Sequence, residues 1–401
     1  MSTKVLDLEL TAGCDPPVLS LRHRHVRFLV RLQGTPIGYI RVENTRTGFD
    51  AAVLRDQAIS WLGSRIWTRL LAEEYADPSA GSGEADVPPA ISVVVCTRDR
   101  ATELEGCLAA LAAQDYSDFE VIVVDNASQE QTTRDVVRRF PFRYVFEPRP
   151  GLDWARNFGL AEARHPIVAY TDDDARPDPG WLSALAAGFA AGVDAVTGLV
   201  VPAELETPAQ VLFEDSYGGM GKGFHPALHS RRGRKRVTFT PNVYGTGCNM
   251  AFRKDALERI GGFDPALDVG TVTGGGGDID AFQRLIESGG ALLYRPDAVV
   301  RHIHRRTAGR LRGQLFDNGR SYSAVLWACM RRARGLDRLR VVYAYWQWLR
   351  CWHAKRIVRR LRRREQMPLK LLVDELRGGF LGPPLYWMAR RRARRLAELK
   401  K

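Results

Sequence analysis

Three consecutive carboxylates, Asp172-Asp173-Asp174, closely follow the apolar run 167–170. Two carboxylates separated by one residue at the end of a strand can bind two different parts of a ligand. One can hydrogen-bond a ribose while the other binds a hard divalent cation through oxygen. Such a cation would act as a Lewis acid on a diphosphate leaving group. A solvated acidic loop has the same composition, so the triplet alone leaves both interpretations open.

A glycine-rich segment, Gly274-Gly275-Gly276-Gly277-Asp278-Ile279-Asp280, is the second candidate for chemistry. Successive glycines allow the backbone to approach a ligand closely. The segment leads into a helical pattern of apolar residues at Phe282, Leu285 and Ile286. Asp278 can therefore act on a ligand or cap the helix that follows it.

A sheet is needed to bring these residues together. The runs 91–95, 121–124 and 167–170 are apolar and rich in β-branched residues, as in parallel strands buried on both faces. Helical patterns separate the runs, and this alternation predicts an α/β fold with a doubly wound, mostly parallel sheet. Ligands of such sheets bind beyond the carboxyl ends of the strands. Because Asp99, Asp125 and the Asp172 triplet follow the three runs, we expect them to meet at one crevice.

Residues 91–305 resemble the family 2 glycosyltransferases, which have a GT-A fold. The landmarks of that family occur here in order over more than half of the chain. They are SVVVCTRDR (92–100), VVDNAS (123–128), GLDWARN (151–157), YTDDD (170–174), GTGCNMAFR (245–253) and GGGGDID (274–280).

The resemblance implies a nucleotide-binding role for five residues. Thr97 and Asp125 occupy positions that hold the nucleotide base, and Arg156 occupies a position that contacts the nucleotide. Asp172 would contact the ribose, with Asp173 beside it in the same site. These roles agree with simple chemistry, because a base edge needs fixed hydrogen-bond partners and an arginine fork can bind a diphosphate.

The resemblance also implies a divalent metal, Mn²⁺ or Mg²⁺, and a general base. Asp174, the last residue of a DXD motif, would ligate the metal, and His302 would complete its ligand set. His302 can instead be an ordinary surface histidine at the end of a strand. Asp278 would take the proton from an acceptor hydroxyl. The chain departs from the family at Gly277, where a glutamate is usual, and Asp280 is expected to be structural.

We therefore expect an inverting, metal-dependent glycosyltransferase that uses a nucleotide diphospho-sugar, with a UDP-sugar as the expected donor, in polysaccharide or glycoconjugate biosynthesis. A sugar-1-phosphate nucleotidyltransferase is a rival, but its glycine-rich phosphate loop is missing after the first strand, at residues 96–100. A catalytically inactive homologue is a further alternative, because the glutamate before Asp278 is absent.

The net charge of +13 is unevenly distributed, because residues 331–401 hold 22 Lys and Arg against 5 Asp and Glu. A pI near 9.7 suggests a nucleic-acid-binding protein, but the remaining residues carry a net negative charge. We therefore expect no nucleic-acid partner. Aromatic residues beside arginines in the tail suit an anionic membrane surface, and a helical subdomain packed on the core is the equal alternative.

The chain is expected to have four parts. These are a small α+β module (1–75), a linker rich in Pro, Gly and Ser (76–89), the catalytic domain (90–305) and a basic helical region (306–401). No signal peptide or membrane-spanning segment is expected. The six cysteines show no metal-ligand spacing and are expected to be free thiols. A cytoplasmic location follows from these expectations, with peripheral attachment at the inner membrane face if the tail binds lipid.

Overall fold

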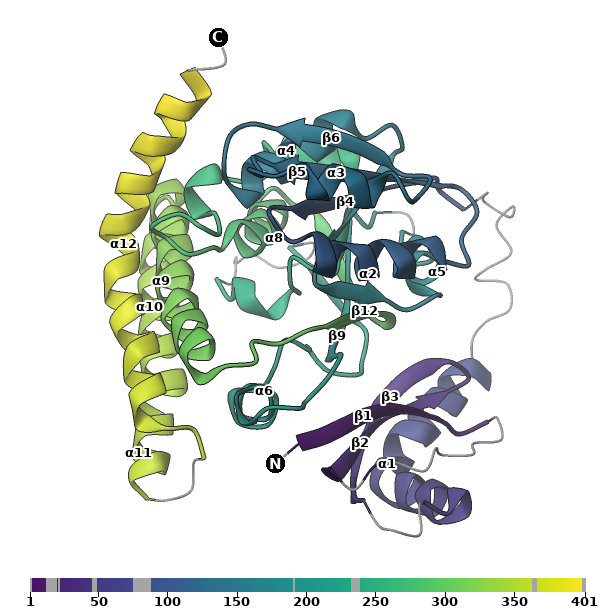
Figure 1. Ribbon diagram of the computed structural model, residues 1–401. Coiled ribbons are helices and arrows are strands. Elements are labelled where there is room, and N and C mark those ends of the chain that lie inside the picture. Colours follow the sequence, from purple (N-terminus) through teal and green to yellow (C-terminus); the bar gives the residue numbers. More distant parts are fainter. Residues whose placement is uncertain are drawn as a thin grey trace.

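The computed structural model describes residues 2–11, 20, 22–44, 49–74, 88–189, 192–231, 239–362 and 366–398. The linker predicted at 76–89 lies outside these residues, apart from its last two positions. The described part forms a central α/β unit, a small sheet with one helix near the N-terminus, and a flank of C-terminal helices (Figure 1).

The parallel half of the central sheet has the strand order β7-β4-β5-β6. Its strands are β4 (Ile91–Thr97), β5 (Phe119–Asn126), β6 (Arg143–Glu147) and β7 (Ile167–Asp172). All seven residues of β4 are buried, as expected for a β-branched strand covered on both faces. The helices α2 (Ala101–Ala112), α3 (Thr132–Val137) and α4 (Leu152–Glu162) connect the strands. The predicted α/β class is confirmed.

The rest of the sheet adds antiparallel pairs, but six of the nine strands in the described residues run in one direction, so the predicted mostly parallel sheet is confirmed. This other half contains β9 (Ala195–Pro202), β10 (Ala227–Ser230), β11 (Met250–Arg253) and β12 (Ala291–His302), and β8 (Ala175–Pro177) pairs with β12. The short strand β11 runs antiparallel to both β7 and β9. Strand direction in this half follows from tertiary pairing, because a four-residue apolar strand has the same pattern in either direction.

Two helical layers cover the sheet and form its core. One apolar cluster joins Val93 and Val95 of β4 to α2 and to α5 (Trp181–Ala186). The other joins Val94 and Cys96 to α4 and to α8 (Gly277–Glu287). Successive residues of one strand thus contribute to opposite layers, and this alternation fixes which side of the sheet each strand-end side chain occupies.

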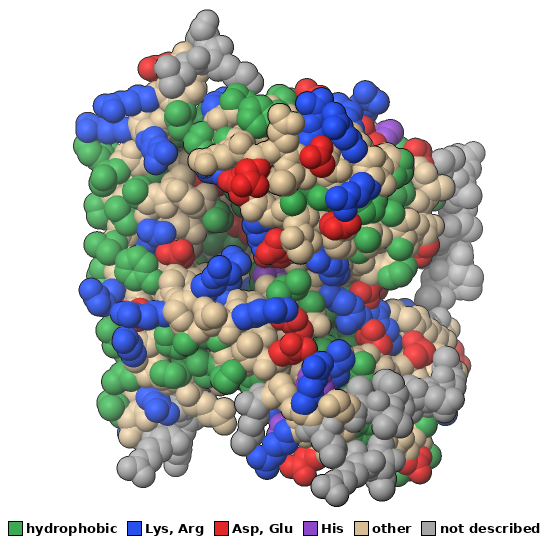
Figure 2. All heavy atoms as spheres, viewed as in Figure 1, with side chains coloured by type: hydrophobic (Ala, Val, Ile, Leu, Met, Phe, Trp, Pro, Cys, Tyr) green, Lys and Arg blue, Asp and Glu red, His purple; other side chains and the backbone are tan. Residues whose placement is uncertain are grey.

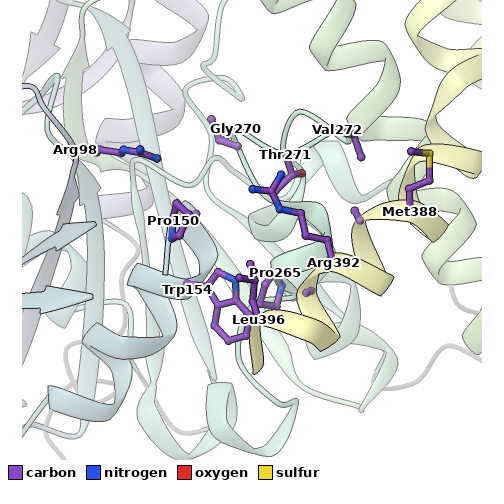
Figure 3. A pocket seen from close by; sticks show the side chains of 14 residues that line it. Arg98, Pro150, Trp154, Pro265, Gly270, Thr271, Val272, Met388, Arg392 and Leu396 are labelled. Carbon is purple, nitrogen blue, oxygen red and sulfur yellow. The ribbon is translucent and has the colours of Figure 1, made fainter. Parts of the chain in front are cut away.

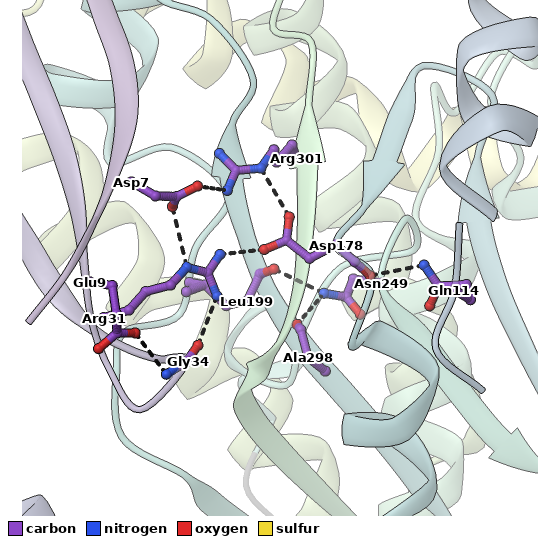
Figure 4. A network of polar contacts seen from close by, with 10 residues as sticks. All are labelled: Asp7, Glu9, Arg31, Gly34, Gln114, Asp178, Leu199, Asn249, Ala298 and Arg301. Carbon is purple, nitrogen blue, oxygen red and sulfur yellow. Dashed lines mark hydrogen bonds and ion pairs between the residues drawn. The ribbon is translucent and has the colours of Figure 1, made fainter. Parts of the chain in front are cut away.

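The N-terminal module consists of β1 (Ser2–Glu9), β2 (His23–Leu32), β3 (Thr35–Glu43) and α1 (Ala51–Glu74). An ion-pair network connects it to the central sheet (Figure 4). Arg301 of β12 contacts Asp178 at 2.9 Å and Asp7 of β1 at 2.6 Å, and Arg31 of β2 also pairs with Asp178. The next residue of β12 is His302, so the module holds the strand that carries this predicted ligand.

The C-terminal helices lie side by side along one flank of the α/β unit (Figure 1). They are α9 (Ala308–Arg332), α10 (Leu336–Gln347), the π-helical η5 (Trp348–Ala354), α11 (Lys355–Leu361) and α12 (Leu369–Glu398). Close packing of α9 and α12 depends on glycine, because a Cβ at Gly319 would lie 1.9 Å from the carbonyl oxygen of Glu375. Within the described ranges, no helix is both long and apolar enough to cross a membrane.

Candidate active site

The register of the parallel strands brings the predicted strand-end residues together. Thr97 pairs with Asp125 across β4 and β5, and Cys96 pairs with Asp172 across β4 and β7. The carboxyl ends of three neighbouring strands therefore meet at one edge of the sheet, as the sequence predicts.

Two members of the acidic triplet are buried, with Asp173 3% and Asp174 4% exposed. Asp173 accepts hydrogen bonds from Thr97 Oγ1 at 2.8 Å and from an Arg100 nitrogen at 2.6 Å. Burial raises the pKa of the Asp173 carboxyl to about 7, although the Arg100 guanidinium acts in the opposite direction. Asp173 and Thr97 thus satisfy each other inside the protein and brace the edge of the site.

Asp172, Asp174 and His302 form a cluster whose ligand atoms all lie within 4.8 Å of one another. Two carboxylate oxygens and one imidazole nitrogen are donors suited to Mn²⁺, and the carboxylates alone suit Mg²⁺. His302 approaches from β12 and its Nε2 lies 3.3 Å from Asp174 Oδ1. The strand end and β12 are far apart in sequence, so the fold assembles this donor set, and the residues present fit a divalent cation.

The electrostatics around Asp174 favour an ionised carboxylate. Burial by itself would raise the pKa of Asp174, but the neighbouring His302 and Arg100 lower it below its ordinary value. Arg100 donates to Asp174 Oδ2 at 2.8 Å. Burial would lower the pKa of His302, and the Asp174 carboxylate raises it above its ordinary value. Asp174 is therefore ionised, and His302 would have to release any proton it holds before its nitrogen could bind a cation.

Arg156 connects the acidic triplet to the acid of the glycine loop. From α4 it contacts Asp172 at 3.8 Å and Asp153 at 3.2 Å. A Cβ at Gly247 would lie 2.5 Å from an Arg156 nitrogen and 2.9 Å from Asp278 Oδ2. The side chains of Arg156 and Asp278 therefore both lie close to Gly247, and the absence of a Cβ at this position leaves room for them.

The glycine loop places Asp278 in the first turn of α8. The carboxylate does not cap the helix, and instead its Oδ2 accepts a hydrogen bond from the backbone nitrogen of Gly247 at 2.6 Å. Positive φ angles of 77°, 131° and 110° at Gly274, Gly275 and Gly276 require glycine at these positions. Asp278 also lines a cavity with a volume of about 1070 Å³.

Gly277 is glycine for a different reason, because its φ is not in the left-handed region. A Cβ at this position would lie 1.8 Å from Asp153 Oδ2. Asp153 is buried, and the same oxygen has no hydrogen-bond partner within the described part of the chain. Burial, and then the charge of Asp268, raise the pKa of Asp153 well above its ordinary value. The side chain of Asp153, from α4, therefore occupies the space that a Cβ at position 277 would need.

Two other predicted residues have internal partners. Asp125 is buried and accepts hydrogen bonds from Tyr144 Oη at 2.8 Å and from the backbone nitrogen of Ser128 at 3.2 Å. Asp280 pairs with Arg284 at 2.7 Å and with Arg332 of α9 at 2.9 Å, which is the structural role expected for it.

Sequence reasoning assigned no role to Arg100, Asp153 or Lys222. Arg100 pairs with two members of the acidic triplet, and Lys222 lines the cavity beside Asp278. Arg100 and Asp153 lie within family landmarks and Lys222 lies in none, but nothing local to any of the three indicates its partner. Only the glycine at position 277, where a glutamate is usual, indicated that another side chain fills the space beside it.

A smaller cavity of about 370 Å³ lies between the start of α4 and the end of α12 (Figure 3). Arg98 and Arg392 approach it from opposite sides, and the indole of Trp154 forms part of its wall. The lining contains no residue that the sequence analysis assigned to the nucleotide, the metal or the base, so the larger cavity next to Asp278 is the better candidate for a substrate.

Comparison with known proteins gives consistent results. Residues 92–261 match the family model for glycosyl transferase family 2. Glycosyltransferase AglE of Haloferax volcanii is 28% identical over 272 residues, which cover 65% of this chain and 80% of that protein. Pre-mycofactocin glycosyltransferase of Mycobacterium tuberculosis is 30% identical over 290 residues, which cover 68% of this chain and 55% of that protein.

Among solved structures, the mannosyltransferase PcManGT from Pyrobaculum calidifontis, in complex with GDP-Man and Mn²⁺, is 20% identical to this chain. The alignment covers 87% of this chain and 97% of that one, with a TM-score of 0.49.

Proposed function

We propose that this chain, whose residues 92–261 match the family model for glycosyl transferase family 2, transfers a sugar from a nucleotide diphospho-sugar to an acceptor hydroxyl with inversion of the anomeric centre. The observation that carries the proposal is the convergence of Asp172, Asp174 and His302 with Arg156 at one edge of the sheet. We expect a UDP-sugar as the donor.

Arg156 and the strand-end residues would hold the donor. The guanidinium of Arg156 lies against Asp172 and can extend toward a diphosphate. Asp172, Asp174 and His302 would hold a Mn²⁺ or Mg²⁺ ion. When bound there, the ion would stabilise negative charge on the departing nucleotide diphosphate.

Asp278 would act as the general base. The hydrogen bond from Gly247 fixes its carboxylate at the wall of the large cavity. An acceptor hydroxyl in that cavity can therefore reach the carboxylate and transfer its proton as the new glycosidic bond forms. General-base assistance of this kind typically contributes about 10²–10⁴ in rate.

The test is a thermal-shift panel of UDP, GDP and their sugar conjugates, with and without Mn²⁺. A ligand at 100 times its Kd adds about 2.7 kcal/mol of stability if it binds only the folded protein. Metal-dependent stabilisation by a nucleoside diphosphate is the expected result. If no nucleotide stabilises the protein with or without the ion, the proposed donor is wrong.

We also propose that the C-terminal helices bind an anionic membrane surface at its cytoplasmic face. Trp346 and Trp387 are about half exposed, and the guanidinium groups of Arg350 and Arg391 lie 4.9 Å and 3.4 Å from their ring centroids. Apolar and basic side chains alternate on the surface of the C-terminal helices (Figure 2). Other tail aromatics, such as Trp348, pack inward against the core, so only part of the tail is available to lipid.

A further inference from the structure

The cavity beside Asp278 is large and lies between the α/β unit and the C-terminal helices. Its volume of about 1070 Å³ is at the upper end of the range of about 300–1,000 Å³ found for pockets that bind small molecules. The segments 217–222 and 239–246 form one wall, and α9, α10 and η5 form the other. There is room for a hydroxylated head group and a further apolar portion.

The walls are mainly aromatic and aliphatic. Seven aromatic side chains contribute to them: Phe213, Tyr217, Phe239, Tyr322, Tyr343, Trp348 and Trp352. Of the lining residues, Asp278, Lys222, Arg340 and Glu375 have side chains that can carry charge. Burial raises the pKa of Glu375 to about 7, which reduces its charge near neutral pH. The lining also includes uncharged polar side chains such as Thr246, Asn318 and Ser321, which can hydrogen-bond a hydroxylated head group.

The rim of the cavity is also apolar. Val243 and Tyr343 both line the cavity and are 41% and 57% exposed. Tyr343 continues into an exposed apolar face of α10 that includes Leu339, Val342 and Trp346. An apolar chain leaving the cavity would therefore meet apolar side chains and not a polar surface.

Both π-helical segments within the described residues border the cavity. These are η2 (Phe213–Tyr217) and η5, which contributes Trp348, Cys351 and Trp352. Single π-helical turns inside α-helices are frequent at functional sites. Here they turn aromatic rings into the cavity from two separate helices, which is an independent sign that the space is built for a ligand.

We propose that this cavity binds an amphipathic acceptor, with its hydroxylated head at Asp278 and a linear apolar chain along the aromatic walls. The inference rests on the proposed function for the role of Asp278. The apolar chain is recognised by burial alone, so its affinity rises with the number of methylene groups that enter the cavity.

Cys351 provides a direct measurement of occupancy. It lines the cavity and is exposed, whereas Cys96, Cys107, Cys248 and Cys329 are buried. Cys14 lies outside the described residues, so the experiment uses a Cys14→Ser background. The rate at which iodoacetamide alkylates Cys351 is measured with octyl β-D-glucoside below its micellar concentration and with methyl β-D-glucoside as the matched polar probe.

Octyl glucoside is expected to protect Cys351 at a concentration at least about tenfold lower than methyl glucoside requires. Val243→Asp, which places a charge on the exposed rim, is expected to abolish this protection. Val358→Asp is the matched control, since Val358 is 45% exposed on α11 but does not line the cavity, and it should leave protection unchanged.

Two results would overturn the inference. One is equal protection by the two glucosides. The other is protection that both aspartate variants lose, or both retain, which would show adsorption on the surface of the helices. Both variants change exposed positions, and their melting temperatures are compared with that of the parent before labelling.

The measurement needs no donor, metal or turnover, so it separates this inference from the proposed function. If Mn²⁺-dependent UDP binding occurs but octyl glucoside gives no selective protection, the acceptor class is wrong and the transferase proposal stands. If protection occurs without any nucleotide binding, the cavity is an amphiphile site and the transferase proposal is wrong.

Discussion

The pair Gly277 and Asp153 allows the most direct test of how the site is assembled. In Gly277→Ala, the new Cβ would lie 1.8 Å from Asp153 Oδ2 and 2.5 Å from its Cγ, far inside van der Waals contact. Both residues are buried, so neither can move into solvent. Overpacking costs about 1–3 kcal/mol, and a contact this short places the cost in the upper part of that range.

The gain in helix propensity from glycine to alanine is at most about 1 kcal/mol and offsets only part of this cost. We therefore expect Gly277→Ala to lower the free energy of unfolding by about 1–2 kcal/mol. In an Asp153→Ala background the obstacle is absent, and the same change should be neutral or stabilising. The expected coupling energy between the two substitutions is at least about 1 kcal/mol.

Urea unfolding of the four proteins in this cycle measures the coupling. Gly313→Ala is the control, because Gly313 lies in α9 and a Cβ added there would meet no described atom within 4 Å apart from its own helix backbone and chain neighbours, so alanine should stabilise the protein. If Gly277→Ala costs the same with and without the Asp153 side chain, the two residues do not share this volume. The double variant Asp153→Ser/Gly277→Glu should have a higher free energy of unfolding than Gly277→Glu alone. In the double variant the carboxylate is moved from α4 to α8, so the two side chains no longer compete for the same space.

Four further outcomes are expected. Asp174→Ala should abolish Mn²⁺-dependent stabilisation by UDP in thermal shift while the apo protein stays folded, and unchanged metal dependence would remove Asp174 from the metal site. Asp278→Asn should lower kcat by about 10²–10⁴ with little change in donor affinity, and a near-normal kcat would assign the base elsewhere. Burial raises the pKa of Glu375 from 4.5 to about 7, so between these pH values the folded protein holds a proton that the unfolded chain has released. The stability that this proton contributes is fully present below the unfolded-state pKa of 4.5 and is lost as the pH rises through 7. Between pH 5 and 8 the parent should lose roughly 3 kcal/mol relative to Glu375→Gln, and parallel pH profiles in urea unfolding would contradict this. The full chain should co-sediment with phosphatidylglycerol vesicles at low salt and not with neutral ones, and deletion of 331–401 should abolish this; binding that survives the deletion would place the lipid contact elsewhere.

The parallel half of the sheet could be predicted from sequence because its signal is local. Continuous β-branched runs at 91–95, 121–124 and 167–170 predict buried strands, and strand polarity alone then brings Thr97, Asp125 and the acidic triplet to one edge. The assigned roles of these residues stay predictions, as does the division of the chain into four parts. The mixed half of the sheet was not predictable, since the direction of a strand such as β11 depends on its neighbours.

The residue types of the site were determined by sequence, and their partners by the fold. An acidic triplet, a histidine at a strand end and an acid after four glycines are recognisable one segment at a time. The contact of Arg100 with Asp173 and Asp174, and the occupation by Asp153 of the space above Gly277, join segments that are distant along the chain. Local patterns carry no information about such contacts, because they depend on which helices and strands pack together in three dimensions.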